Sequence, residues 1–123
     1  MCQFSAWLRP EYGVWRAFRA ALGGQAVVVA AVGSDGLDYV ERLKSWGVAT
    51  EAVRPIDDSF TAQAFITTDL DDNQITAFHP GAMNESHQNS VKDAKDVSLA
   101  IIAPDGREGM FQHARGCHEA GIP

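Results

Sequence analysis

The stretch Ser59–Met83, SFTAQAFITTDLDDNQITAFHPGAM, decides how the rest of the chain is interpreted. Its two runs rich in Thr, Ile and Phe, at 61–68 and 74–78, are typical of β-strands. The short polar stretch between them, Asp69–Asn73, has the length and residue types of a hairpin loop. Pro80 and Gly81 end the second run, because proline has no N–H to donate to a strand ladder. The stretch therefore predicts a β-hairpin.

Composition and charge set limits on what the chain does. Its 123 residues, 46% of them hydrophobic, are enough for one globular domain. A net charge of −6 leaves no basic stripe for a nucleic-acid backbone, so no nucleic-acid partner is expected. No apolar run approaches the roughly 18 residues of a membrane span, and Met1–Tyr12 lacks the apolar core of a signal peptide. Cys2 and Cys117 are too few and too far apart in sequence for a disulfide framework. We expect a soluble, cytoplasmic protein with no membrane partner.

On either side of the hairpin, strand-like and helix-like patterns alternate. The runs Ala26–Val32 and Val97–Ala103 are almost wholly apolar, as central strands of a parallel sheet are. Helical spacing predicts one helix over 13–22 and a second that starts at Ser34 or Asp35 and ends near Trp46. The residues Arg54–Asp58 indicate a polar turn, and 84–96 a loop with a weak helix around Val91.

A last helix is predicted to open at Pro104–Asp105. Its apolar side consists of Met110, Phe111, Ala114 and Cys117, and its glycines at 106, 109 and 116 weaken it. The resulting order of helix, strand, helix, hairpin, strand and helix predicts an α/β fold, with helices on both faces of the sheet.

Several short segments, taken in order, resemble the ribokinase-like (PfkB) kinases. The hairpin run ITTDLDDNQITAFHPGAM looks nearest to the bacterial adenosine-kinase-like branch of that family. The resemblance covers about Leu22–Pro123 and implies a three-layer, Rossmann-like α/β fold. It also implies transfer of the ATP γ-phosphoryl group to a hydroxyl of a sugar or nucleoside, with ATP and Mg²⁺ required by a complete member. The matching segments are Leu22-Gly23-Gly24, Ala31–Asp35 (AVGSD), Leu43, Gly47-Val48 and Thr61-Ala62.

The chain also departs from the family's pattern. Residues 9–14 read RPEYGV where the family has Gly-Gly-x-x-x-Asn. The family's first strand, with its substrate-holding acid, and the Gly-x-Gly-Asp segment, with the anion hole and base, are not among these residues. Phosphoryl transfer depends on such positioning and charge stabilisation, so we expect no catalytic residue, no bound cofactor and no activity of the chain alone. The alternative is a noncatalytic α/β module that binds a nucleoside or serves association.

In this interpretation residues 1–123 are one partial domain. Residues 1–24 are a divergent N-terminal segment with a helix, and 25–123 are the N-terminal-middle part of a kinase domain. The predicted strands Ala26–Val32 and Val97–Ala103 then lack flanking strands. Because open strand edges and uncovered apolar faces favour association, homo-oligomers or aggregation are expected.

Three residues are candidates for contact with a sugar or nucleoside substrate. The resemblance places Phe78, at the end of the hairpin, where an aromatic ring stacks on a nucleobase. Phe65 in the partner strand is a candidate for the same wall. The competing interpretation is that both rings pack in the core. Asp105 follows the second apolar strand, where ligands meet open sheets, and is equally placed to cap the last helix.

Three further clusters favour a structural role over a functional one. Gly33-Ser34-Asp35-Gly36 joins a strand to a helix like a phosphate loop, but it has no Lys, and a helix cap is favoured. Asp69–Asn73 has the alternating carboxylates of a calcium loop without its later Gly and Glu, so a solvated turn is favoured. His113, Cys117 and His118 lie within two turns of one helix without a further Cys pair, which favours a surface helix over a zinc site. No metal site is predicted.

Overall fold

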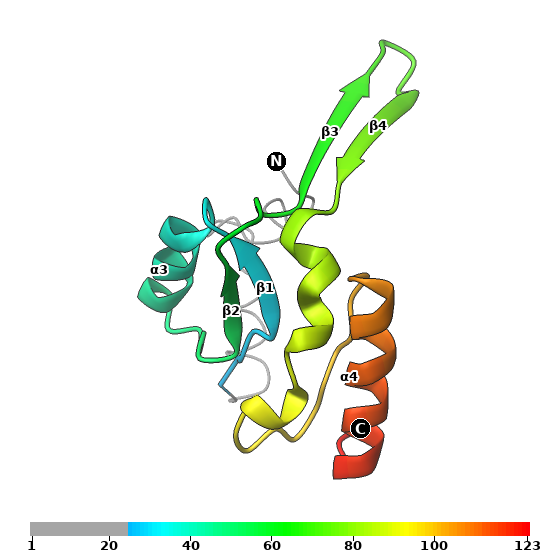
Figure 1. The fold of residues 1–123 in the computed structure, drawn as a ribbon. Helices are drawn as coiled ribbons and strands as arrows, with labels where there is room; N and C mark the ends of the chain where they lie inside the picture. Colours follow the sequence, from blue (N-terminus) through cyan, green and yellow to red (C-terminus); the bar gives the residue numbers. More distant parts are fainter. Residues whose placement is uncertain (1–24) are drawn as a thin grey trace.

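The computed structural model describes residues 25–123 (Figure 1). The predicted helix over 13–22 and the divergent residues 9–14 lie outside this range. In chain order the elements are β1 (Ala30–Gly33), α3 (Leu37–Ser45), β2 (Val53–Ile56), β3 (Gln63–Thr68), β4 (Gln74–His79), the 3₁₀ segments η2 (Gly81–Gln88) and η3 (Val91–Asp93), and α4 (Arg107–Ala120). The chain is therefore of the α/β class, as the sequence predicts.

The first sheet is parallel and consists of β1 and β2. Its register pairs Ala30 with Val53 and Gly33 with Ile56, and an upstream bridge joins Val27 to Ala49. The strand predicted at Ala26–Val32 is thus confirmed in its second half, Ala30–Val32, whereas in its first half Val27 forms an isolated bridge. Most of this segment is half-buried. Figure 1 shows α3 on one side of this sheet and η2 with α4 on the other, which is the expected three-layer arrangement.

The polar turn predicted at Arg54–Asp58 is wrong in its first half, because Val53–Ile56 forms β2. Pro55 does not prevent this. Within the described sheet β2 is an edge strand. A proline is tolerated there because its missing N–H can lie on the side that faces no other strand.

The helix α3 closes the apolar core on its side of the sheet. Leu43 is buried with Ala26 and Val48, and Val28, Tyr39 and Trp46 pack against this cluster. The helix ends where predicted, since Gly47 follows it with a φ of 73°, in the left-handed region that favours glycine. The described helices are too short and too polar to cross a membrane.

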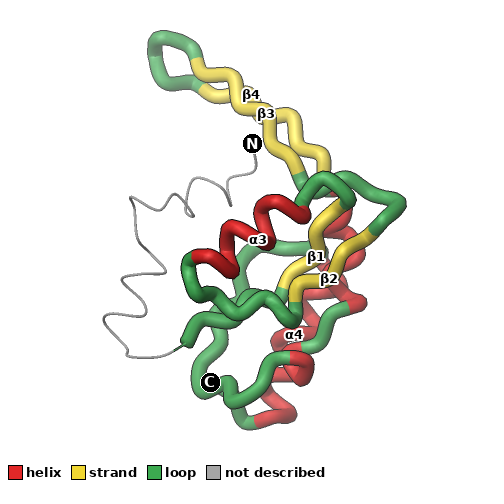
Figure 2. The backbone as a smooth tube through the Cα atoms, turned by 90° about the vertical axis from the view of Figure 1, so that its left-hand side faces the viewer, coloured by secondary structure: helices red, strands yellow, loops and turns green. Residues whose placement is uncertain are grey.

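The predicted hairpin is confirmed as an antiparallel pair, β3 and β4. Its register runs from Gln63 opposite His79 to Thr68 opposite Gln74. Figures 1 and 2 both show the hairpin projecting away from the layered body. We call β3, β4 and their connecting turn the arm. Because the arm has no layer against it along most of its length, its side chains beyond Ala64 are exposed.

The helix α4 packs against η2 through a face that matches the predicted apolar side only in part, since Cys117 is buried and Met110 half-buried. Its buried residues are Gly109, His113 and Cys117, whereas Phe111 and Ala114, assigned to the apolar side, are exposed. The reason is close approach. A Cβ on Gly109 would collide with the Ser86 side chain of η2, so only glycine lets the two segments meet there. The close approach of α4 to η2 at Gly109, and not the apolarity of the side chains, therefore determines which face of α4 is buried.

The second apolar strand, predicted at Val97–Ala103, is wrong. This segment forms no strand in the described part of the chain, and Leu99, Ile101 and Ile102 are exposed. Its Ala100 N–H donates to the Pro123 carbonyl at 3.0 Å instead of to a sheet. An apolar run makes a strand only where a neighbouring strand supplies hydrogen-bond partners.

Candidate functional site

The two candidate aromatic residues lie on opposite faces of the arm. Phe78 pairs with Ala64, and Phe65 pairs with Ala77. Directly opposed residues share a face of a sheet, and successive residues alternate between faces. We call the face with Ala64, Ile66, Thr76 and Phe78 the Phe78 face, and the other the Phe65 face. The prediction that both rings line one wall is therefore wrong, because the register separates them.

Neither ring belongs to the core. Phe78 is 50% exposed and Phe65 60% exposed, which contradicts the competing interpretation of both as core residues. Ala64, only 8% exposed, is the small residue directly opposite Phe78. Sequence analysis missed Ala64, because an alanine carries no chemical signal. Only the cross-strand register places it beside the aromatic ring.

Asp35 links the loop after β1 to the residue that leads into the arm. Its Oδ1 accepts hydrogen bonds from the Thr61 N–H and from Thr61 Oγ1, both at 2.7 Å. Thr61 Oγ1 in turn accepts from the Gly33 N–H at 3.0 Å. The Thr61 backbone bond, followed by the Thr61 side-chain bond, lowers the pKa of the Asp35 carboxyl below its usual value.

This geometry corrects the interpretation of Gly33–Gly36 as a helix cap. The residue at the cap position of α3 is Gly36, and no side chain caps the helix. Since the Asp35 carboxylate is bonded to Thr61 and negatively charged, it does not favour a phosphate at this loop either.

The strand that leaves the arm, β4, is held at the same base by backbone contacts. The Ala82 N–H donates to the Phe60 carbonyl at 2.8 Å. Gly81 has a φ of +48°, and a Cβ at this position would collide with the Phe60 carbonyl oxygen. We call the junction of Gly33–Gly36, Ser59–Thr61 and Gly81–Ala82 the arm root.

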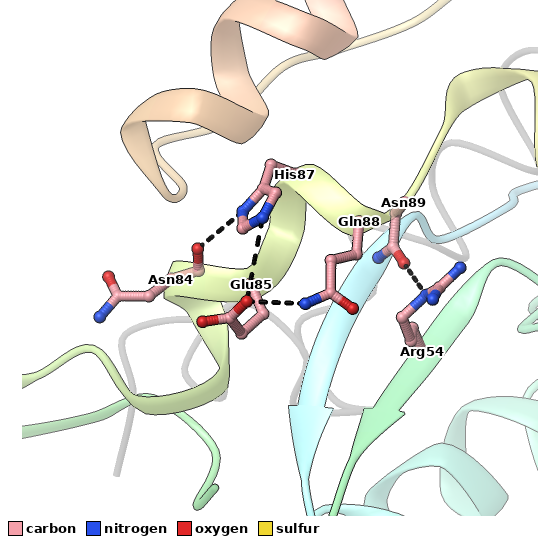
Figure 3. A network of polar contacts seen from close by, with 6 residues as sticks. All are labelled: Arg54, Asn84, Glu85, His87, Gln88 and Asn89. Atoms are coloured by element: carbon pink, nitrogen blue, oxygen red, sulfur yellow. Dashed lines mark hydrogen bonds and ion pairs between the residues drawn. The ribbon is translucent and has the colours of Figure 1, made fainter.

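An open polar hollow lies beside the arm root. It is lined by the residues that connect β2 to the arm, by the end of β4 and by η2, including Asp57, Asp58, His79, Asn84, Glu85 and Gln88. Figure 3 shows that part of this lining is already bonded to itself. Glu85 accepts from Gln88 Nε2 at 2.7 Å, and the Asn84 carbonyl lies 3.0 Å from Nδ1 of His87, a neighbouring residue of η2 outside the lining. Carboxylates and amides of this kind suit a ligand with hydroxyl groups better than a phosphate.

Asp105 lies two residues before the start of α4. Its Oδ1 accepts from the Gly106 N–H at 2.8 Å, and it is half-buried. Gly106, not Asp105, occupies the cap position, and no strand precedes it. Both structural premises for Asp105, a strand end and a helix cap, are therefore wrong. A substrate contact from Asp105 stays a prediction.

The described residues offer no ligand set for a metal. No group of three or more His, Cys, Asp or Glu among residues 25–123 is arranged to hold one. Asp69 uses its carboxylate within the turn, where it accepts from Asp71 and Asn73. His113 and Cys117 are buried against η2 and η3 rather than on a surface face, and His113 Nε2 lies 3.3 Å from the Asn89 carbonyl.

The chain is similar in sequence and structure to known kinases. No family model matches the chain. A nucleoside kinase from Methanothermobacter thermautotrophicus is 38% identical over 104 residues, which are 77% of this chain and 34% of that protein.

Among solved structures, the nucleoside kinase of Burkholderia thailandensis in complex with inosine is 50% identical, with a TM-score of 0.76 over 83% of this chain and 34% of that one. The nucleoside kinase of Methanocaldococcus jannaschii, an archaeal member of the ribokinase family, is 26% identical, with a TM-score of 0.68 over 77% of this chain and 32% of that one. This chain spans about a third of the length of these relatives. From the hairpin, the layered α/β body and these matches, we conclude that the chain belongs to the ribokinase-like (PfkB) kinase family.

Proposed function

We propose that the chain forms the substrate-side part of an ATP-dependent nucleoside kinase, in which the Phe78 face of the arm is one wall of the nucleoside site. The observation that carries this proposal is the half-exposed Phe78 ring on a projecting strand pair. A relative of the same family, 50% identical to this chain, has been solved with inosine bound, which supports a nucleoside as the ligand.

The chemistry of the Phe78 face favours a nucleoside over a free sugar. An aromatic ring offers a stacking surface to a base, and such a stack contributes about 1–3 kcal/mol. Ala64, directly opposite, has only a methyl group, and the Phe78 ring beside it is half-exposed. Ribose alone has no flat face to stack on Phe78.

Phosphoryl transfer needs more than this wall. The Gly-x-Gly-Asp segment that would hold the anion hole and base is not among the 123 residues. We therefore expect that the purified chain transfers no phosphoryl group from ATP to adenosine, inosine or ribose. Turnover above the enzyme-free rate, abolished by a substitution within the chain, would contradict this expectation.

The nucleoside site is tested by two matched substitutions in the arm. Phe78→Ala and Phe65→Ala each remove one exposed aromatic ring, from opposite faces of the same strand pair. NMR titration of the chain with inosine, adenosine and ribose measures binding to each variant. We expect Phe78→Ala to weaken nucleoside binding by roughly 1–3 kcal/mol, the usual contribution of a base–aromatic stack, and Phe65→Ala to leave it unchanged.

A denaturant melt of each variant separates binding from folding. Since both rings are exposed, neither substitution should cost the roughly 3–5 kcal/mol of a buried Phe. Equal loss of binding in both variants, or loss of folding in Phe78→Ala alone, would remove the support for a nucleoside wall at Phe78.

A further inference from the structure

We propose that Asp35 is a positioning residue that fixes the direction of the arm relative to the parallel sheet. Its carboxylate lies at the arm root, where the loop after β1 meets the residue before β3. The inference deepens the proposed function, on which it rests for one reason only: the direction of the arm decides where the Phe78 face lies.

The contacts of Asp35 all point toward the arm. Oδ1 accepts two bonds from Thr61, and Oδ2 lies 3.5 Å from Gln63 Nε2, on the first residue of β3. Hydrogen bonds to an ionised carboxylate are roughly twice as strong as bonds between neutral groups. Through Thr61 Oγ1 the chain of bonds continues to the Gly33 N–H, at the end of β1. One side chain thus connects both sheets.

The backbone around Asp35 is packed too closely to adjust. A Cβ on Gly33 would collide with the backbone of Phe60 and Thr61, and a Cβ on Gly36 would lie 2.8 Å from Thr61 Oγ1. The Ser34 N–H also donates to the Ser59 carbonyl, at 3.0 Å. The loop after β1 is therefore in direct backbone contact with Ser59–Thr61, which lead into the arm, and Asp35 makes the side-chain hydrogen bonds at this contact.

The length of the arm makes its root important. A six-residue strand is about 20 Å long, so a tilt of about 10° at the root moves the tip by roughly 3–4 Å. Phe78 lies close to the root, opposite Ala64, only three residues beyond Thr61. A small rotation at Thr61 consequently turns the Phe78 face without altering the strand pairing.

The inference is tested with Asp35→Ala, Asp35→Asn and Thr61→Val in the full chain. The matched control is Asp38→Ala, which removes an exposed carboxylate from the first turn of α3 and makes no contact with the arm that the structure records. Residual dipolar couplings measure the direction of β3 and β4 relative to α3 and α4. Amide hydrogen exchange measures how firmly the strands are held.

In Asp35→Ala we expect that the residual dipolar couplings of β3 and β4 no longer fit the same alignment tensor as those of α3 and α4. Exchange in the β3–β4 ladder should rise about tenfold or more, the change expected on loss of hydrogen bonds to a charged group, while exchange in α4 stays the same. Asp35→Asn keeps an acceptor oxygen and should restore most of the orientation. Thr61→Val, which keeps the backbone N–H, should have an intermediate effect, and Asp38→Ala none.

Unchanged couplings in Asp35→Ala would overturn the inference, and so would an equal rise of exchange in α4, which indicates only global destabilisation. The two proposals fail separately. If the arm turns in Asp35→Ala but the unmodified chain binds no nucleoside, the positioning role stands and the nucleoside site falls. If the arm does not turn but Phe78→Ala weakens binding, the reverse holds.

Discussion

Single residues control how the second helical layer packs. Gly106, at the cap position of α4, and Gly109, within the helix, both lie against Ser86 of η2, whose side chain is fully buried. By propensity alone a glycine costs a helix about 1 kcal/mol relative to alanine. At Gly109 the contact is possible because glycine has no side chain. The closer approach of α4 to η2 then offsets the lower helix propensity of glycine.

Two alanine substitutions on α4 should therefore have opposite effects. In Gly109→Ala the new methyl would lie 3.1 Å from Ser86 Cβ and 3.2 Å from the His87 backbone nitrogen. We expect a loss of about 1–2 kcal/mol, because overpacking exceeds the gain in propensity. In Gly116→Ala the methyl approaches one side-chain atom, Val91 Cγ2 at 2.8 Å, and no backbone, so a shift of half-buried Val91 relieves the contact. Here the stability should rise by up to about 1 kcal/mol.

Urea unfolding followed by circular dichroism measures both changes. Ser86→Gly combined with Gly109→Ala removes the obstructing side chain and should restore part of the loss. If Gly109→Ala proves as stable as Gly116→Ala, the close contact between η2 and α4 is not as described.

At the scale of elements, the arm is held by a carboxylate at each end. Asp35 bonds to Thr61 at the root. Asp69, at the tip, accepts from the N–H groups of Asp71 and Asn73 and from Asn73 Nδ2, each at 2.9 Å. The side-chain and backbone bonds from Asn73 lower the pKa of Asp69. The turn that the sequence predicts as solvated is therefore also internally bonded.

Acid should loosen the arm before the body. Because the folded-state pKa values of Asp35 and Asp69 lie below those of the unfolded chain, their contribution is fully present above about pH 4. It is lost as the pH falls through the folded-state values. The methyl resonances of Ile66 and Ile75 should shift toward random-coil positions below about pH 4, ahead of the resonance of buried Leu43.

Asp69→Asn keeps the acceptor oxygen and removes the titration, so it provides the control. Its tip resonances should change less with pH than those of the unmodified chain. Simultaneous loss of the Ile75 and Leu43 signals in both proteins would show that the acid response belongs to the whole fold.

At the scale of the whole molecule, much apolar surface is left uncovered. Ile101 is 75% exposed and Ile75 79% exposed, and both lie in extended or strand segments that lack a covering layer. Within the described residues, β1 and β2 form a sheet of only two strands. Exposed apolar patches next to open strand edges favour association, so the self-association expected from the sequence stays a prediction.

We therefore expect the chain to self-associate, and Ile101→Lys to reduce this association. Sedimentation velocity over a series of concentrations measures the distribution of species. Gln112→Lys, on the exposed polar side of α4, makes the same change in charge without removing apolar surface and should behave like the unmodified chain. A monomer at every concentration, with a cooperative melt, would contradict the expectation.

The sequence by itself determined the local elements of this protein. The hairpin, α3 and the second half of the strand predicted at Ala26–Val32 follow from hydrophobic period, turn residues and glycine stops, all of which act between near neighbours. A last helix was also predicted, but α4 begins at Arg107 and not at Pro104–Asp105. The order of these elements also carried the family, because the spacing of the short motifs survives in the chain even where single motifs are weak.

The tertiary structure alone decided which faces meet. Phe65 and Phe78 were separated by the pairing register, and Asp35 was assigned to the arm root by residues 26 positions further along the chain. The same holds for the segment 97–103, which is as apolar as a strand but has no neighbouring strand among the described residues. It also holds for α4, where the face with Gly109 is buried and Phe111 is exposed. Pairing and close approach depend on partners that are distant in sequence, and a local pattern contains no information about them.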